Sequence, residues 1–553
     1  MKADIITKQE KYAKCGFLIL LTLQIIMMLF FCIKKQEFHI DEIYSYILSN
    51  SYDCEKLSAS KDIKNHWICG SDSFNDFVTV QPDERFAYDK TYYNNTRDAH
   101  PPLFYFVLHT VCSFFPDKFS KWLGLSVNLL TFVLTQLILL RISRMLFRES
   151  IWQLLPVALY GFSPIAVDTV LYIRMYSMLT LFTLMLFYIH LLMFEEKIKY
   201  PYLWCFGVTF LGVFTQYYFA IAAFYLALVC CIVLWKNKKI RDLLYYSVSM
   251  MSGVLLIFLV YPAALRQITG SDTNNVGNEV SSNITDFSLL KERLSAYREQ
   301  FRNRMIPNWK WSLLYISILS VILIFSVILR SRSNKKIFAY NPVNAIKKAF
   351  VQTKTMYLFM TAVIVFMTVV TISHISGKFS YLRYFYNIMP IVFFLFAAAI
   401  YYFSSMFNVN RTVLSGGLIV LALISGAGTV VKKNCEYLFE YRYRVVSETV
   451  EFLADKPLVL IDKHANHVLT GNFTLLSSAD MLYITDTDEI SIDDLTAEVD
   501  VSDGVAVLII NNTDWSEGYI GDEVMQRLVD SSQKFESYEK YCDESYSTVY
   551  WIH

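Results

Sequence analysis

Charged side chains are scarce in this 553-residue sequence, at 18% of all residues, whereas hydrophobic residues make up 55% and aromatic residues 16%. A soluble chain of this length usually divides into several domains with charged surfaces, so the composition argues against a soluble protein. The apolar residues come in runs of roughly 18 to 22, the length that a helix needs to cross the hydrocarbon core of a bilayer. We therefore predict an all-α polytopic membrane protein.

Several other features are missing. None of the ten cysteines shows a CxxC spacing, which argues against a zinc motif. Cys54 with Cys69, and Cys435 with Cys542, are candidates for disulfides, and buried thiols are an equal alternative. No internal repeat or low-complexity linker occurs. No small-residue cleavage site follows the first apolar run, so we predict an uncleaved span there rather than a signal peptide.

The apolar runs predict eleven spans, at about 16–33, 123–140, 150–168, 175–194, 202–219, 220–235, 243–262, 311–329, 355–373, 385–404 and 412–431. Lysines precede the first span, so the positive-inside rule places the N-terminus in the cytoplasm of a multi-pass plasma-membrane protein. The same rule places the basic clusters at 141–148, 236–241 and 330–348 inside, which leaves the C-terminus outside. If the run at 102–115 crossed the membrane, the basic cluster at 141–148 would lie outside. We therefore interpret this run as an interfacial or re-entrant helix.

Three segments then lie on the outer side of the membrane: a large first loop at about 34–121, a second loop at about 263–310, and the tail from 435. The stretches "KPLVLID", "MLYIT" and "VAVLII" in the tail are typical of buried strands between turns. We predict a transmembrane domain at 1–434 and a small extracytoplasmic α/β domain at 435–553. The tail holds 24 acidic and 7 basic side chains, which argues against nucleic acid as a partner.

Ionisable and aromatic side chains gather at the predicted outer ends of different spans. Such residues beside apolar spans are functional candidates, because burying charge in a membrane is costly. They are Asp41 and Glu42, His100, Tyr172 and Arg174, Tyr217 and Tyr218, Arg266, Lys378 and Arg383. A carboxylate can act as a general base, and arginines can bind a phosphate and stabilise its developing charge. This combination indicates a reaction on a lipid-linked phosphate, such as a polyprenyl-phosphate sugar.

The motifs that hold these residues resemble those of the GT-C glycosyltransferases. "HIDEIYSY" is similar to the Asp-Glu motif of the first outer loop, and "DAHPPLFYF" to an HPPLYY motif. "YIRMYSMLTLF", "TQYYF" and "LRYFYNIMPIV" are similar to three later motifs of that group, in the same order. More narrowly, the set resembles the protein O-mannosyltransferase-like family 39 and the lipid A aminoarabinose transferase group. It covers roughly residues 16 to 405, and the acidic tail has no counterpart.

The resemblance implies a GT-C fold in which Asp41 is the catalytic base and Glu42 shapes the acceptor pocket or tunes Asp41. It implies that Arg174 and Arg383 hold the donor phosphate, that His100 lines the site, and that the sugar is transferred with inversion. Gln216 stands where the family often has histidine, and Ile173 occupies a small-residue position before Arg174.

Weaker candidates complete the predicted site. Lys378 and Arg266 are assigned to the donor phosphate, and Tyr172, Tyr217 and Tyr218 to the substrate pocket. Each residue has a structural alternative: an acidic pair can cap a helix, arginines can snorkel to the interface, and tyrosines can form an aromatic belt.

We predict a transferase that moves a hexosyl or pentosyl group from a polyprenyl-phosphate donor to a protein, lipid or glycan acceptor, in contact with membrane lipid. No cofactor is required, because arginines neutralise the phosphate. A divalent cation held by His39, Asp41, Glu42 and His100 is an open alternative. The alternative functions are a flippase or transporter of polyprenyl-linked glycans, and a glycan polymerase or ligase. The near absence of charge in the middle of the spans argues against a transport path.

Overall fold

The computed structural model describes residues 2–51, 65–269, 283, 286–305, 353–376, 381–406, 409–453, 456–461, 472–485, 499, 501, 503–510, 521–531, 535–543 and 547–553. The chain divides into two compact units. Unit 1 comprises Met1–Ile33, Asp98–Phe104 and Leu125–Glu436, and unit 2 comprises Lys34–Arg97, Tyr105–Gly124 and Tyr437–His553. Each unit is described by itself below.

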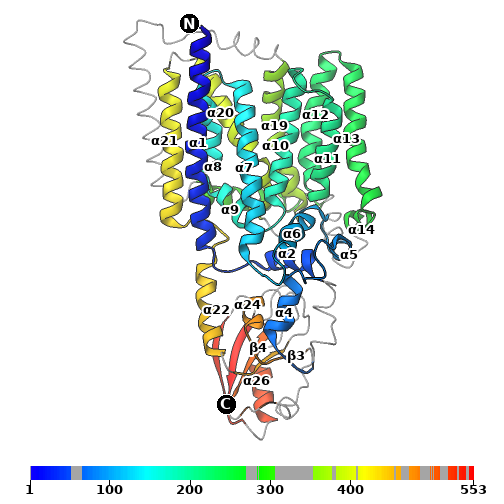
Figure 1. Ribbon diagram of the computed structural model, residues 1–553, viewed down its shortest axis with the longest axis vertical. Coiled ribbons are helices and arrows are strands. Elements are labelled where there is room, and N and C mark those ends of the chain that lie inside the picture. Colours follow the sequence, from blue (N-terminus) through cyan, green and yellow to red (C-terminus); the bar gives the residue numbers. More distant parts are fainter. Residues whose placement is uncertain are drawn as a thin grey trace. The chain divides into compact units, whose positions relative to one another are not determined.

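Helices dominate the described residues up to the end of α22 (Figure 1). They are α1 (Lys2–Lys34), α2 (Ile40–Asn50), α4 (Gly70–Val78), α5 (Tyr88–Thr96), α6 (Leu103–Ser113), α7 (Lys121–Leu146), α8 (Ser150–Gly161), α9 (Pro164–Leu171), α10 (Tyr176–Phe194), α11 (Pro201–Thr215), α12 (Phe219–Lys236), α13 (Ile240–Val260), α14 (Ala263–Thr269), α16 (Leu290–Met305), α19 (Thr353–Ile375), the 3-10 helix η1 (Leu382–Ile388), α20 (Met389–Met406), α21 (Arg411–Lys432) and α22 (Glu440–Leu453).

Eight helical segments in the described part of the chain are long and apolar enough to cross a membrane. They are Lys11–Lys34, Lys121–Leu146, Tyr176–Phe194, Phe219–Lys236, Ile240–Val260, Met356–Ile375, Leu382–Ser404 and Arg411–Lys432. This set confirms a multi-pass membrane protein. The predicted span at 311–329 lies outside the described residues.

Two predicted spans differ in the structure. The span predicted at 150–168 is the pair α8 and α9, bent by 57°. The bend follows from the local sequence, because Ser163 accepts a hydrogen bond from Ala166 N and Pro164 begins a new helix. The span predicted at 202–219 is α11, which ends at Thr215 after 15 residues. At 1.5 Å per residue such a helix is about 22 Å long, shorter than the hydrocarbon core.

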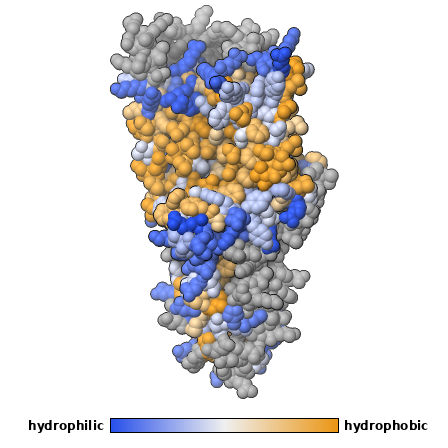
Figure 2. Space-filling view, turned by 45° about the vertical axis from the view of Figure 1, so that its right-hand side comes forward, coloured by the Kyte–Doolittle hydropathy of each residue, from blue (hydrophilic) through white to orange (hydrophobic). Residues whose placement is uncertain are grey.

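The surface of the helical bundle carries a broad hydrophobic band (Figure 2). Large apolar side chains on several spans face outward, among them Leu18, Leu130 and Phe224 at 61%, 61% and 62% exposure. A water-soluble bundle would bury such residues, so the band is what a lipid-facing surface requires. The run at 102–115 contains α6, an 11-residue helix, which agrees with its interpretation as a segment too short to span.

The C-terminal segment holds the three predicted strands. They are β2 (Leu458–Ile461), β3 (Leu482–Thr485) and β4 (Val505–Ile510), with β2 parallel to both of its neighbours. An antiparallel pair, β5 (Tyr538–Asp543) and β6 (Ser547–Ile552), extends the sheet beyond β4. Short helices α24 (Phe473–Ser477) and α26 (Gly521–Asp530) accompany the strands. The predicted α/β character of the tail is confirmed.

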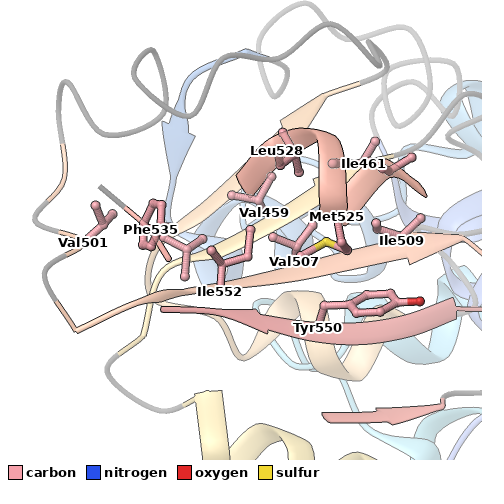
Figure 3. Close-up of a cluster of buried hydrophobic side chains, with 12 residues drawn as sticks. Val459, Ile461, Val501, Val507, Ile509, Met525, Leu528, Phe535, Tyr550 and Ile552 are labelled. Atoms are coloured by element: carbon pink, nitrogen blue, oxygen red, sulfur yellow. The ribbon is translucent and has the colours of Figure 1, made fainter. Parts of the chain in front are cut away.

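One face of the sheet packs on α26 (Figure 3). Alternate side chains of β2 and β4, such as Val459 and Val507, contact Met525 and Leu528 of the helix in a cluster of buried side chains. Burial of this apolar area is the main force that holds the sheet and the helix together.

The sheet also contains a strand from far away in the sequence. β1 (Trp67–Ile68), from the predicted first outer loop, pairs antiparallel with β3, and the sheet order is β1-β3-β2-β4-β6-β5. Gly70 begins α4 beside α24, and a Cβ atom at this position would lie 2.1 Å from the carbonyl oxygen of Leu476. Unit 2 is therefore built from the first loop and the tail together. None of the described cysteines forms a disulfide, and Cys54 lies outside the described residues.

Candidate functional site

In unit 1, the side chain of Arg383 contacts Tyr172, which lies two residues before Arg174 in the chain. This residue ends α9, and its carbonyl oxygen accepts hydrogen bonds from Asn128 Nδ2 at 2.7 Å and from Arg174 N at 2.7 Å. The Tyr172 hydroxyl accepts a hydrogen bond from Arg383 Nη1 at 2.8 Å. Arg174 is 6% exposed, and Arg383 is partly buried. Sequence reasoning assigned Tyr172, Arg174 and Arg383 to one site, and the structure brings the side chains of Arg383 and Tyr172 into contact.

Aromatic rings surround the Arg383 guanidinium. Its carbon lies 4.0 Å from the centre of the Tyr381 ring, 5.3 Å from that of Tyr172 and 5.9 Å from that of Tyr384. The predicted pocket residue Tyr218 contacts Tyr384, with ring centres 5.1 Å apart. Arginine faces stacked on aromatic rings keep their charge while losing part of their hydration, which favours an anionic ligand. The ring cluster thus holds a cation in a partly desolvated position.

A second polar cluster in unit 1 contains His100. His100 Nδ1 lies 2.7 Å from Asp98 Oδ2, and each side chain is about a quarter exposed, at 24% and 25%. Burial raises the pKa of Asp98, but His100 and Arg174 oppose this effect and hold it below its ordinary value. The Asp98 carboxylate is therefore ionised, orients the imidazole of His100 and interacts electrostatically with Arg174.

Gln267 fixes the backbone of this cluster. Its Nε2 donates to Asp98 O at 2.6 Å and to the Tyr261 hydroxyl at 2.9 Å, and its Oε1 accepts from the Tyr217 hydroxyl at 2.5 Å. Burial, and to a smaller degree the charge of Asp98, raise the pKa of Tyr217. Sequence reasoning predicted Tyr217 and His100 but missed Asp98 and Gln267. The two-residue spacing in "DAH" was the available signal for Asp98.

Helix α16 packs against the arginine site. The Tyr297 hydroxyl donates to Ser376 Oγ at 2.9 Å, and its ring lies 4.7 Å from that of Phe385. Burial raises the pKa of Tyr297 to about 12, against smaller opposing effects that include the charge of Arg383. The predicted second outer loop thus contributes an ordered helix beside Arg383.

In unit 2, Asp41 and Glu42 begin α2 in different environments. His39 is the N-cap, and its Nδ1 accepts from Asp41 N at 3.1 Å. Glu42 is fully buried and accepts from His39 N at 2.6 Å, which completes a capping box. The Asp41 side chain is 26% exposed, and its Oδ2 lies 3.6 Å from His39 Nδ1. Of the acidic pair, Asp41 is thus the carboxylate that a substrate can reach.

Glu42 also forms a buried ion pair that sequence reasoning missed. Lys35 Nζ lies 2.8 Å from Glu42 Oε2, and both side chains are 0% exposed. Lys35 Nζ donates as well to the carbonyl oxygen of Tyr437, at 3.0 Å. The capping interpretation of Glu42 is therefore correct in geometry, although the residue is buried rather than solvated. A catalytic role for Asp41 or Glu42 stays a prediction.

Two of the predicted donor-binding residues, Arg266 and Lys378, and the predicted metal alternative are the remaining predictions for the site. Arg266 is exposed on α14, next to the inward-facing Gln267, and Lys378 lies outside the described residues. Among the residues that the structure describes, no group of three His, Cys, Asp or Glu side chains is arranged to hold a metal ion. Asp41 and Glu42 belong to unit 2, whereas the arginines, the tyrosines and His100 belong to unit 1.

Comparisons with known proteins were made by sequence and by structure. No family model and no curated protein matches the sequence. Two solved structures of ArnT from Cupriavidus metallidurans are similar over nearly the whole chain, one bound to undecaprenyl phosphate and one in the apo state. Each is 10% identical, with a TM-score of 0.48; the matches cover 97% and 98% of this chain and 98% of each ArnT chain. Identity and structural agreement of this size leave the family of the chain open.

Proposed function

We propose that the protein is an integral membrane glycosyltransferase of the GT-C type, which moves a sugar from a polyprenyl-phosphate donor to an acceptor at the outer face of the membrane. The observation that carries the proposal is the hydrogen bond from Arg383 to the Tyr172 hydroxyl, which brings Arg383 to the segment that carries the buried Arg174, just before a membrane-spanning helix. Arginine side chains can bind the phosphate of a lipid bidentately, and the neighbouring spans would keep the lipid tail of such a donor at the same depth.

In this mechanism the donor phosphate binds at Arg174 and Arg383, and its lipid tail stays in the bilayer. The C1–O bond to the phosphate breaks as the acceptor oxygen attacks C1 from the opposite side. The two guanidinium groups stabilise the second negative charge that forms on the released phosphate. His100, oriented by Asp98, lines the same site.

Asp41 acts as the general base in this proposal. It takes the proton of the acceptor hydroxyl as the new bond forms, a role that contributes about 10²- to 10⁴-fold to the rate in enzymes generally. Its partly exposed side chain at the start of α2 supports the assignment, because Glu42 is occupied by Lys35 and the capping box. The acceptor is a protein, lipid or glycan hydroxyl.

The decisive experiment uses purified full-length protein in lipid nanodiscs with a series of defined polyprenyl-phosphate sugars. The measurement is release of free polyprenyl phosphate, which a transferase produces and a flippase does not. Asp41→Asn is expected to lower turnover by at least about 10²-fold. Asp89→Asn, at an exposed position of α5 in the same unit, is the matched control with unchanged turnover. Full turnover by Asp41→Asn would remove this residue as the base.

The phosphate assignment has a separate test. Arg174→Ala and Arg383→Ala are expected to weaken donor binding, measured by titration with a donor analogue that lacks a cleavable sugar bond. Tyr172→Phe removes the hydroxyl that accepts from Arg383, so we expect a smaller loss of donor affinity. Unchanged donor affinity in both arginine variants would refute a phosphate site at Tyr172.

A further inference from the structure

The segment before α2 makes several hydrogen bonds with the C-terminal part of the chain. We propose that the C-terminal segment of unit 2 is a working part of the active site, in which Lys35 is the positioning residue that sets the orientation of Asp41. This inference rests on the proposed function, because it takes Asp41 as the base. It gives the acidic tail a role in catalysis.

A continuous series of polar contacts leads from the tail to Asp41. The Tyr437 carbonyl oxygen accepts from Lys35 Nζ at 3.0 Å, and Lys35 pairs with Glu42 at 2.8 Å. Glu42 Oε2 accepts from His39 N at 2.6 Å, and His39 Nδ1 accepts from Asp41 N at 3.1 Å. If the Tyr437 carbonyl group moved, Lys35 and Glu42 would therefore move with it. The backbone of Asp41, which is bonded to His39, would then be displaced as well.

Lys35 is held on its other sides as well. Its ammonium group lies 5.0 Å from the centre of the Phe439 ring, and its own carbonyl oxygen accepts a hydrogen bond from Lys121 Nζ. The neighbouring Gln36 N donates to Leu438 O at 3.1 Å. A cation that is 0% exposed and surrounded in this way has one stable position, so the carboxylate that it pairs with is fixed too.

A second attachment joins the same segment to α24. Glu37 is 4% exposed, and its Oε1 accepts from Thr474 Oγ1 at 2.7 Å and from Phe38 N at 2.9 Å. Its Oε2 is buried and has no hydrogen-bond partner among the described residues. The Phe38 ring packs on Phe119, which in turn contacts Phe473 of α24. The start of this segment, at Lys35 and Glu37, is thus anchored to tail residues.

The side chains of this segment differ in burial, and the buried ones can only position their neighbours, whereas the exposed ones can contact a substrate. Lys35 and Glu42 are 0% exposed, so neither can touch a substrate, whereas Asp41 and His39 are 26% and 24% exposed. A base must meet the acceptor proton within hydrogen-bond distance, and a displacement of about 1 Å can lower a rate about 10²-fold. The ion pair therefore affects turnover through the geometry of Asp41 and leaves the binding of the donor to unit 1 unchanged.

The test compares Lys35→Met with Lys34→Met in the full-length protein in nanodiscs. Lys34 is the adjacent lysine and is exposed, so it is a matched control. We expect Lys35→Met to lower kcat about tenfold to a hundredfold with an unchanged KM for the donor, and Lys34→Met to match the wild type. The double variant Lys35→Met/Glu42→Gln removes both charges and keeps a side chain that completes the capping box, so it should recover most of kcat.

A variant in the tail tests whether the tail residues themselves hold the segment before α2. Thr474→Val keeps the side-chain shape and removes the hydrogen bond to Glu37, so kcat should fall several-fold, again with an unchanged donor KM. Wild-type kcat in both Lys35→Met and Thr474→Val, each folded, would overturn the proposal. The proposal would also be overturned if kcat fell as far in the double variant as in Lys35→Met. That result would mean that the unpaired charge of Glu42 is not the cause of the loss.

Hydrogen exchange separates this inference from the proposed function. Amide exchange of residues 36–50 should be faster in Lys35→Met and in Thr474→Val than in the wild type or in Lys34→Met. If the wild type releases no polyprenyl phosphate from any donor, the proposed function fails, and the exchange data still decide whether the tail holds Asp41. Unchanged exchange in both variants would refute the positioning role whatever the activity.

Discussion

Replacement of Arg304 by methionine is expected to loosen α16 from the rest of unit 1. Arg304 lies in the last turn of this helix, and its Nε is 3.7 Å from Oδ2 of Asp168, a residue that is 0% exposed. Its Nη2 is 3.0 Å from Glu436 Oε2, and Glu436 N donates to Asp168 Oδ1 at 2.7 Å. Methionine keeps most of the length of the side chain and removes the charge that faces Asp168.

The expected loss of stability follows from the burial of the ion pair between Arg304 and Asp168. Removing one partner of a buried ion pair costs about 3–5 kcal/mol, because the other charge stays buried without compensation. Arg304 is 20% exposed and its contact with Asp168 is long, so we expect the lower end, about 3 kcal/mol. A loss of this size raises the population of the open state about 100-fold. Amide exchange of residues 290–305 should accelerate by the same factor.

Arg302 is the matched control on the same helix. It is 67% exposed and lies 3.8 Å from Glu299, so Arg302→Met should cost no more than about 1 kcal/mol. A second variant, Arg304→Met/Asp168→Asn, removes both charges and should recover a large part of the protection. If Arg304→Met exchanged no faster than Arg302→Met, the buried ion pair would have no role in holding α16. Because α16 carries Tyr297 beside Arg383, we also expect a weaker affinity of Arg304→Met for the donor.

Three further outcomes follow from the described contacts. Asp98 has a lowered pKa in the folded protein, so its ionised form stabilises the fold above the unfolded pKa of about 3.9 and the contribution is lost as the pH falls through the folded value. The gap in melting temperature between the wild type and Asp98→Asn should therefore be present at pH 7 and close below about pH 4; a gap independent of pH would contradict this. Gly70→Ala places a Cβ atom against backbone at 2.1 Å, so proteolysis should cut unit 2 faster than in the wild type, and equal rates would contradict the close packing of α4 on α24. Arg383→Lys keeps the charge but loses the planar contact with the Tyr172 and Tyr381 rings, so donor affinity should fall about tenfold in calorimetry; full affinity would show that charge alone suffices.

Much of the architecture was predictable because it depends on local patterns. A run of about 20 apolar residues has few alternatives to a membrane-spanning helix, and eight of the predicted spans are unbroken helices of that kind. The three strands of the tail were predictable for a similar reason, since short runs such as that in β4 are rich in β-branched residues and end at turn residues. The break between α8 and α9 was not predicted although Ser163 and Pro164 are a local helix-start signal, because the apolar run continues on both sides of them.

The site itself depended on contacts that no local pattern contains. The sequence by itself determined most of the apolar spans, offered a helix start at Asp41 and Glu42 as an alternative to catalysis, and indicated that His100, Arg174 and Arg383 are unusual beside apolar spans. Only the tertiary structure decided that Glu42 is neutralised by Lys35 and that Asp98 orients His100. Only the structure placed β1 of the first loop in the sheet of the tail. The reason is physical: apolar burial is set by periodicity along the chain, whereas the environment of a charge is set by groups hundreds of residues away, such as the Tyr437 carbonyl that holds Lys35.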